Sequence, residues 1–170
     1  MVNIALVGCN GKMGKAVTSA VQSRNDCEIV FGADPFGTPA YDYPVFESLA
    51  VSDKKADVII DFSNPASLDD ILAYALEKKI PCVLCTTGYS PEQVEKIKKA
   101  SESVAVFYSG NMSLGINLLI ELSKEAAKIL GAADFDIEIV EKHHNQKIDA
   151  PSGTALMIAD GISDTLAEEP

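Results

Sequence analysis

The sequence reads Val2-Asn3-Ile4-Ala5-Leu6-Val7-Gly8-Cys9-Asn10-Gly11-Lys12-Met13-Gly14 near its beginning, and this stretch decides the fold. Residues 2–7 are almost continuously apolar, which is typical of a central parallel strand covered on both faces. Three glycines follow in a G-x-x-G-x-x-G pattern, a close relative of the fingerprint that binds dinucleotides. Apolar residues then recur at helical spacing, so we predict a helix over residues 12–24.

Each glycine has a physical role in such a turn. Together they permit a tight bend, a close approach of the backbone to a pyrophosphate, and close packing of helix on strand. The N-terminus of the helix offers N–H groups and positive potential to phosphates, and Lys12 adds a cation. The alternative is a structural glycine turn in an unrelated α/β protein.

Asp34 ends the second predicted strand, about 20 residues after Gly14, where an acidic side chain would bind the ribose hydroxyls. Pro35 rather than Arg follows it, and the 2′-phosphate of NADP usually needs a cation at this place. We therefore expect NADH to be preferred, with NADPH possible because Lys12 could neutralise that phosphate.

The first 112 residues alternate apolar runs with amphipathic stretches. Asn64-Pro65 and Ser90-Pro91-Glu92-Gln93 have the form of helix starts. The apolar runs predict strands over residues 28–33, 57–62, 81–86 and 104–108, with a short helical stretch over 47–52. Strands that alternate with helices predict an α/β fold with a doubly wound, parallel, Rossmann-type sheet.

The pattern changes near residue 112, so we place a domain boundary there. Residues 1–112 are expected to bind a dinucleotide and residues 113–170 to bind substrate. The second domain is predicted to have helices over 114–130 and 152–167 and a strand over 136–141, in which Ile137 and Ile139 point inward. The long helix is expected to carry its apolar residues on one side, at Ile116, Leu119, Ile120, Ala127 and Leu130. One strand is too few for a sheet, so this smaller α+β domain is expected to be incomplete.

The composition narrows the range of partners. The 170 residues carry 14 Lys and Arg against 25 Asp and Glu, a formal net charge of −11. Such a surface repels phosphate backbones and anionic lipids, so neither nucleic acid nor membrane is an expected partner. No apolar run approaches the roughly 18 residues of a membrane span, and the first residues lack the features of a signal peptide. We therefore expect a cytoplasmic protein with reduced cysteines.

One cysteine pattern, Cys82-Val83-Leu84-Cys85, matches C-x-x-C. It lies in a predicted strand, where positions i and i+3 face opposite ways. The two thiols are therefore not expected to converge on a metal or on each other.

The only two histidines, His143 and His144, are adjacent in a polar loop before the last predicted helix. In an extended chain only one of them can face a given cleft. Histidine titrates near neutral pH and can give a proton to a substrate carbanion, while Lys147 supplies a positive charge for a carboxylate. Ser152-Gly153-Thr154 then open the helix and could cradle an anion.

This loop predicts a site that holds a small polycarboxylate beside a proton donor. One alternative is a solvated loop that caps the helix. Another is a metal site of Glu141, His143 and His144, but further ligands to complete a coordination shell are lacking, so no metal is predicted. Thr86-Thr87-Gly88 and Ser109-Gly110-Asn111-Met112 follow the C-terminal ends of strands, where ligands bind in such sheets, although ordinary turns would look the same.

These motifs together resemble those of the dihydrodipicolinate reductase family of lysine and diaminopimelate biosynthesis. The longest shared block runs from Glu141 to Ala155 and is similar to the family signature E-x-H-H-x-x-K-x-D-A-P-S-G-T-A. The resemblance covers the whole chain in the family's order, and it includes the glycine turn, Thr86-Thr87-Gly88 and Asn111-Met112-Ser113-Leu114-Gly115.

The resemblance implies roles for individual residues. His143 would be the proton donor and Lys147 a second catalytic residue. Substrate would contact His144, Ser152, Gly153 and Thr154. The cofactor would be lined by Gly8, Cys9, Asn10, Gly11, Lys12, Met13, Asp34, Cys85, Thr86, Thr87, Ser109, Gly110, Asn111 and Met112. The family commonly has Gly where this chain has Cys85, so that contact would come from the backbone.

The implied reaction is hydride transfer from NAD(P)H to a cyclic dicarboxylate, 4-hydroxy-tetrahydrodipicolinate, which yields tetrahydrodipicolinate. Family members are longer and form homotetramers, and their additional strands complete the second sheet and much of the subunit interface. Cofactor binding should therefore survive better in this chain than catalysis or tetramer formation. Two alternatives stay open: a non-catalytic, truncated NAD(P)-binding module, and another two-domain Rossmann oxidoreductase such as an amino-acid dehydrogenase, against which the block at residues 143–154 counts.

Overall fold

The computed structural model describes residues 1–36, 41–133, 135–145, 147 and 150–167 of the chain. The chain divides into two compact units, Met1–Ser109 and Gly110–Pro170. Gln146, Ile148 and Asp149, which belong to the predicted substrate loop, lie outside the described residues.

The first unit is built on a six-stranded sheet in which every neighbouring pair is parallel. The strand order is β3-β2-β1-β4-β5-β6, so the order reverses between β1 and β4. The strands are β1 (Val2–Val7), β2 (Cys27–Ala33), β3 (Val45–Phe46), β4 (Val58–Asp61), β5 (Cys82–Leu84) and β6 (Val106–Tyr108). This confirms the predicted doubly wound sheet, and ligands bind in such sheets outside the strand C-termini where the order reverses.

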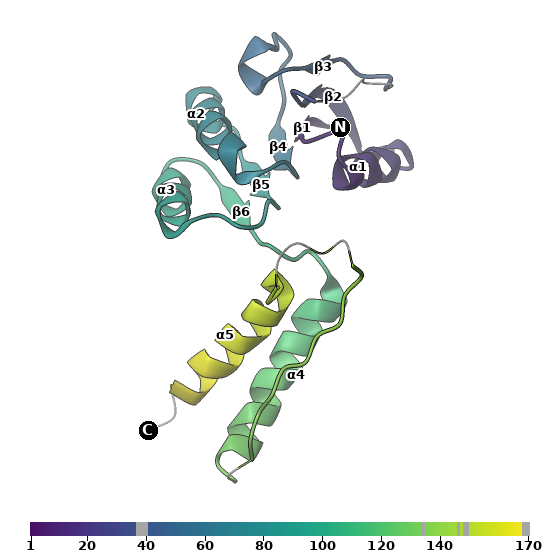
Figure 1. Ribbon diagram of the computed structural model, residues 1–170. Coiled ribbons are helices and arrows are strands. Elements are labelled where there is room, and N and C mark those ends of the chain that lie inside the picture. The colour runs from purple at the N-terminus through teal and green to yellow at the C-terminus, as the bar shows by residue number, and fades with distance from the viewer. Residues whose placement is uncertain (37–40, 134, 146, 148–149, 168–170) are drawn as a thin grey trace. The chain divides into compact units, whose positions relative to one another are not determined.

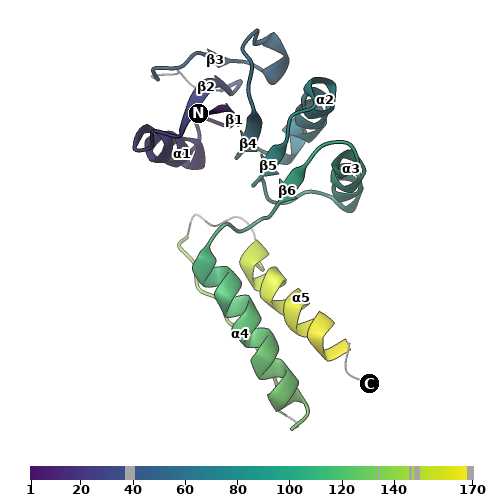
Figure 2. The same ribbon diagram turned by 180° about the vertical axis from the view of Figure 1, so that it is seen from behind.

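Helices cover both faces of this sheet. α1 (Lys12–Gln22) lies on one face, and α2 (Leu68–Lys78) and α3 (Pro91–Ser101) lie on the other, as Figures 1 and 2 show. The core between the sheet and α2 includes the fully buried Phe31, Ile59 and Leu68. The short helix predicted over residues 47–52 is a single 3-10 turn, Leu49–Val51, and the two-residue β3 before it was not predicted.

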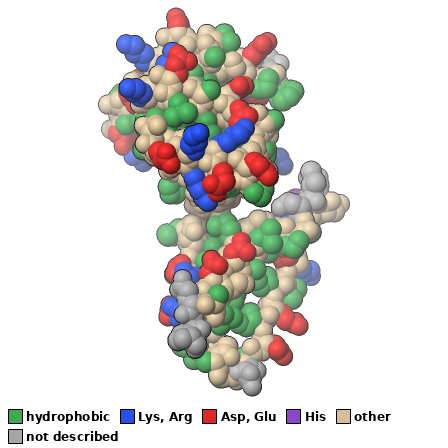
Figure 3. Space-filling view, turned by 90° about the vertical axis from the view of Figure 1, so that its left-hand side faces the viewer, with side chains coloured by type: hydrophobic (Ala, Val, Ile, Leu, Met, Phe, Trp, Pro, Cys, Tyr) green, Lys and Arg blue, Asp and Glu red, His purple; other side chains and the backbone are tan. Residues whose placement is uncertain are grey.

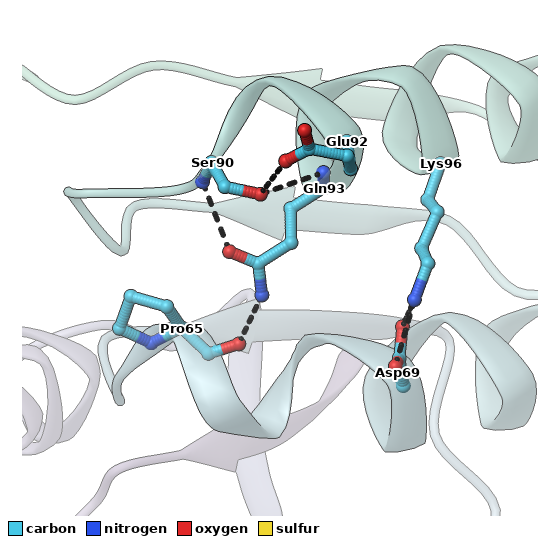
Figure 4. Close-up of polar contacts among 6 residues, drawn as sticks. All are labelled: Pro65, Asp69, Ser90, Glu92, Gln93 and Lys96. Atoms are coloured by element: carbon cyan, nitrogen blue, oxygen red, sulfur yellow. Dashed lines mark hydrogen bonds and ion pairs between the residues drawn. The ribbon is translucent and has the colours of Figure 1, made fainter.

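The start of α3 has the predicted capping box. Ser90 Oγ accepts a hydrogen bond from Gln93 N (3.3 Å), and Gln93 Oε1 accepts one from Ser90 N (3.0 Å). Gln93 Nε2 also donates to Pro65 O (2.7 Å), which joins α3 to the 3-10 turn Pro65–Ser67 before α2 (Figure 4). An exposed ion pair between Lys96 of α3 and Asp69 of α2 (2.7 Å) links these two helices directly.

The second unit consists of α4 (Leu114–Gly131), α5 (Gly153–Ala167) and the segment between them. The two helices run side by side in the same direction, and the chain from residue 135 returns along α4 (Figures 1 and 2). Gly161 of α5 allows the two helices to approach closely, because a Cβ at this position would lie 3.2 Å from Ile120 Cγ2 of α4. None of the described helices combines the length and apolar character needed to cross a membrane.

The strand predicted over residues 136–141 is not formed. The described part of the second unit contains no strand, and Ile137 and Ile139, expected to point inward, are 42% and 41% exposed. A strand requires a partner to satisfy its backbone groups, and the described residues of this unit offer none. The predicted apolar side of α4 is likewise not fully covered, since of its five residues only Ala127 is buried.

Candidate functional site

The turn between β1 and α1 depends on glycine at two positions. Gly8 adopts φ +75°, and a Cβ there would lie 2.6 Å from Phe62 O. A Cβ on Gly14 would overlap the Gly8 carbonyl oxygen and lie 2.5 Å from Cys9 Cα. Because neither glycine has a Cβ, α1 can begin directly against the end of β1, as a dinucleotide-binding turn requires.

The N-terminus of α1 is suited to an anion. Its N-cap is Gly11, and no described side chain caps the helix. The first turn, which the structure describes in full, carries no acidic residue, while Lys12 is exposed there. The positive end of the helix is therefore not neutralised by a carboxylate from its own first turn.

Asp34 lies against this turn. Its Oδ2 accepts a hydrogen bond from Asn10 N (2.9 Å), and its Oδ1 accepts one from Phe36 N (2.9 Å). Asn10 Nδ2 donates in return to Phe36 O. A carboxylate has about four acceptor sites, so these two bonds fix the position of Asp34 and leave capacity for a ligand.

A cavity of about 710 Å³ opens beside the turn, at the C-terminal ends of β1, β2 and β4. Four predicted cofactor residues line it: Gly8, Asn10, Gly11 and Asp34. The prediction missed its remaining polar walls, which are Glu47, Ser48, Ser63, Asn64, Ser67 and Asp70. Ser63 and Asn64 directly follow β4, so their place after a strand C-terminus was the signal that could have found them.

Several predicted cofactor residues do not line this cavity. The Cys9 side chain is fully buried, and burial together with the Asp34 charge raises the pKa of its thiol to about 11. Its thiol is therefore neutral near pH 7 and packs beside Gly32, while its carbonyl accepts a hydrogen bond from Tyr41 OH (2.8 Å). Lys12 and Met13 are exposed.

The end of β5 is mostly buried. Burial, with a smaller contribution from the Asp61 charge, raises the pKa values of Cys82 and Cys85 to about 11, and both are free thiols. The Thr86 hydroxyl is buried and makes no hydrogen bond of ordinary geometry with the described residues, whereas Thr87 is exposed. The Cys85 and Thr86 side chains are thus inaccessible from the surface of this unit.

A buried carboxylate, Asp61, was not identified from the sequence. It ends β4 and accepts hydrogen bonds from Ser63 N (2.9 Å), Ser63 Oγ (2.5 Å) and Tyr89 OH (3.2 Å). Burial and the Asp61 charge both raise the pKa of Tyr89. Asp61 thereby joins the turn after β4, which lines the cavity, to the loop after β5.

In the second unit, two predicted site residues meet near the N-termini of the helices. Asn111 Nδ2 donates to Thr154 Oγ1 (3.2 Å), and Asn111 Oδ1 accepts from Ser113 N (2.8 Å). A Cβ on Gly153 would meet no described atom within 4 Å, so the start of α5 is open. Gly110 and Met112 are exposed, and Ser109, in the first unit, donates from its backbone to Leu84 O (3.1 Å).

The predicted catalytic histidine is held by Glu141. Glu141 Oε2 lies 2.7 Å from His143 Nε2, and Oε1 accepts a hydrogen bond from Ser152 N (2.9 Å). The bond from His143, followed by those from Ser152, lowers the pKa of Glu141 to about 2. Sequence reasoning considered Glu141 as a possible metal ligand and as the first residue of the family signature block, but not as a partner of His143. His144 is exposed, and Lys147 N donates to His144 O (3.2 Å).

Family models match both parts of the chain. The model described as "Dihydrodipicolinate reductase, N-terminus" matches residues 2–112, and "Dihydrodipicolinate reductase, C-terminus" matches residues 115–169. Two curated relatives, from Clostridium tetani and Clostridium novyi, are 52% and 47% identical over 99% of this chain. Both carry the name 4-hydroxy-tetrahydrodipicolinate reductase.

One solved structure is similar over nearly the whole chain. A dipicolinate-bound dihydrodipicolinate reductase from Paenisporosarcina sp. TG-14 superimposes with a TM-score of 0.75 at 30% identity. The match covers 97% of this chain and 66% of that one. The chain likewise spans about two thirds of the length of the curated relatives it matches, 66% for the Clostridium tetani protein and 67% for the Clostridium novyi protein.

Proposed function

This chain belongs to the dihydrodipicolinate reductase family, and from that premise we propose that it is an oxidoreductase of lysine and diaminopimelate biosynthesis. Its reaction would be the reduction of 4-hydroxy-tetrahydrodipicolinate to tetrahydrodipicolinate with NAD(P)H. The observation that carries the proposal is the match of both family models, in order, to residues 2–112 and 115–169. The domain boundary near residue 112 would then separate cofactor binding from substrate binding.

The first unit fits a dinucleotide. Gly8 and Gly14 leave room for the backbone to approach a diphosphate, and the α1 N-terminus supplies the positive potential. Asp34 stands beside the turn with acceptor capacity for ribose hydroxyls. When bound, the nicotinamide supplies the hydride, and the protein supplies position and electrostatics.

The charges around the cavity support a preference for NADH. Of the described residues that line it, the charged ones are Asp34, Glu47 and Asp70, and all are acidic. A 2′-phosphate near Asp34 would meet repulsion, whereas ribose hydroxyls would find an acceptor. NADPH stays possible because Lys12 is exposed at the edge of the same turn.

The second unit supplies the chemistry on the substrate. His143 would give a proton to the carbon next to the one that is reduced, and Lys147 would balance the charge of a carboxylate. Gly153 and Thr154 open α5, where an anion gains from the helix N-terminus. Ser152 is a weaker substrate ligand, since its N–H is bonded to Glu141 and its hydroxyl caps α5.

The same proposal implies a cellular location, a kind of substrate and an oligomeric state. The net charge and the biosynthetic reaction are those of a protein that works in the cytoplasm, where Cys9, Cys27, Cys82 and Cys85 would stay reduced. The substrate is a small cyclic dicarboxylate rather than nucleic acid or membrane, in keeping with the net charge of −11. The resemblance to the family also implies a homotetramer, in which much of the subunit interface is formed by strands of the longer family members.

Steady-state oxidation of NADH with freshly made substrate tests the proposal. We expect His143→Gln to lower kcat about 10²–10⁴-fold, the usual contribution of a general acid, while the Kd for NADH changes less than about threefold because the dinucleotide turn is untouched. Asn145→Ala, at an exposed position of the same loop, is the control and should leave both within about twofold.

Equal effects of His143→Gln on turnover and on NADH binding would contradict the proton-donor role. A second candidate function is a non-catalytic NAD(P)-binding module. The observation in its favour is that residues 135–144 of the second unit form no sheet. NADH binding without any turnover in the unmutated chain would decide for that module.

A further inference from the structure

Both oxygens of the Glu141 carboxylate are engaged, and they hold two different parts of the second unit. Oε2 lies 2.7 Å from His143 Nε2, and Oε1 accepts a hydrogen bond from Ser152 N at 2.9 Å. The side chains of Glu141 and His143 are 25% and 36% exposed. One carboxylate therefore bridges the imidazole and the residue that precedes α5.

The Ser152 end of this bridge is firmly anchored. Ser152 is 5% exposed and caps α5, because its Oγ accepts from Ala155 N (3.1 Å) and its carbonyl accepts from Leu156 N (3.0 Å). The same first turn contains Gly153 and Thr154. Glu141 thus ties the imidazole of His143 to the turn proposed to bind a substrate carboxylate.

The chemistry of the bridge selects one tautomer of His143. An ionised carboxylate only accepts hydrogen bonds, so the nitrogen that faces it, Nε2, carries the hydrogen. Glu141 stays ionised over the whole neutral range, since its hydrogen bonds lower its pKa to about 2. The other nitrogen, Nδ1, is then the atom through which the ring takes up and releases a proton.

We propose that Glu141 is a positioning residue that fixes the Nε2–H tautomer of His143 and sets Nδ1 as the proton-transferring atom. The proposal rests on the proposed function for its catalytic meaning, but the tautomer itself is a property of the folded chain. It assigns the glutamate of the E-x-H-H block a role through His143 rather than a contact with substrate. Carboxylate–histidine pairs fix the imidazole in this way in other enzymes.

Glu141→Gln separates this role from simple packing. In the bridge, one carboxylate oxygen faces His143 Nε2 and the other faces Ser152 N. An amide replaces one of these two oxygens by an NH2 group, which donates, so in this geometry only one of the two N–H groups keeps its acceptor. Glu141→Asp keeps two accepting oxygens on a shorter side chain and serves as the conservative variant. Glu138→Gln, at an exposed position of the same segment, makes the same chemical change away from the bridge.

The decisive measurement is the ring tautomer of His143, read from ¹⁵N–¹H spectra of histidine-labelled chain and assigned with His143→Gln. We expect the Nε2–H form in the wild-type chain and in Glu138→Gln, and a shift towards Nδ1–H in Glu141→Gln, with Glu141→Asp closer to wild type. An Nδ1–H form in the wild-type chain, or an unchanged tautomer in Glu141→Gln, would overturn the proposal.

Turnover provides the second readout. Glu141→Gln should lower kcat at least about tenfold and leave the KM for NADH within about twofold, because a misplaced proton donor slows chemistry rather than cofactor binding. Loss of kcat and NADH binding together would mark a structural role only and would overturn the proposal. If the wild-type chain shows the Nε2–H tautomer but no turnover, the positioning stands and the proposed function fails.

Discussion

At the level of single residues, the turn between β1 and α1 depends on the missing side chains of two glycines. Gly8 and Gly14 have no Cβ, and that space is what brings the ends of β1 and β4 and the start of α1 together. Asp34 and Asn10 then hold the turn in place through backbone N–H groups. We therefore expect a single added methyl group at this turn to weaken NADH binding and to lower the stability of the fold together.

Gly14→Ala is the sharpest test of this point. Its Cβ would lie 2.5 Å from Cys9 Cα, so the turn must shift, and we expect the free energy of unfolding to fall by about 2–4 kcal/mol with at least a tenfold weaker NADH affinity. Urea unfolding and NADH titration measure the two effects. Gly115→Ala in α4, whose Cβ would come no nearer than 3.8 Å to Ser113 Oγ, should be neutral or slightly stabilising. Equal behaviour of the two variants would refute the steric argument.

At the level of helices and strands, the Gln93 side chain makes two kinds of hydrogen bond that fix the start of α3. Gln93 completes the capping box with Ser90 and also donates to Pro65 O, at the turn that leads into α2. The cap satisfies N–H groups that the helix itself cannot, and the contact with Pro65 sets how α3 packs beside α2. The stability of this side of the sheet should therefore respond to the cap.

Ser90→Ala should lower the free energy of unfolding by about 1 kcal/mol, the usual value of an N-cap. Chemical denaturation followed by circular dichroism gives the value. Ser103→Ala, at an exposed serine just beyond α3, should stay within about 0.5 kcal/mol of the unmutated chain. A Ser90→Ala variant as stable as Ser103→Ala would show that the capping box does not support the fold.

The helices and strands also show which parts of the fold could be predicted from the sequence. Five strands of the sheet, the capping box of α3 and the Asn64 cap before α2 follow from local pattern. They are confirmed because apolar runs and caps act over a few residues. The two-residue β3 is too short to give a pattern, and the strand over 136–141 is wrong because pairing depends on a neighbour, not on alternation alone. The bridges made by Asp61 and Glu141 were missed because they join residues brought together only by the fold.

At the scale of the whole molecule, charge and exposed apolar surface set the conditions for function. With a net charge of −11, the chain repels anions in general, so an anionic cofactor must be held by the local donors of the glycine turn. In the second unit, Leu114, Ile129 and Val140 are 86%, 72% and 85% exposed, and hydrophobic side chains are visible over its surface in Figure 3. We therefore expect the contacts with the diphosphate to come from the first unit, whose core is buried.

The most direct test of the central claim is a crystal structure of the chain grown with NADH. We predict density for the diphosphate on the turn between β1 and α1, within hydrogen-bond distance of its backbone N–H groups, and the adenosine ribose beside the Asp34 carboxylate. Density for the dinucleotide away from the Gly8–Gly14 turn, or a ribose that avoids Asp34, would contradict it.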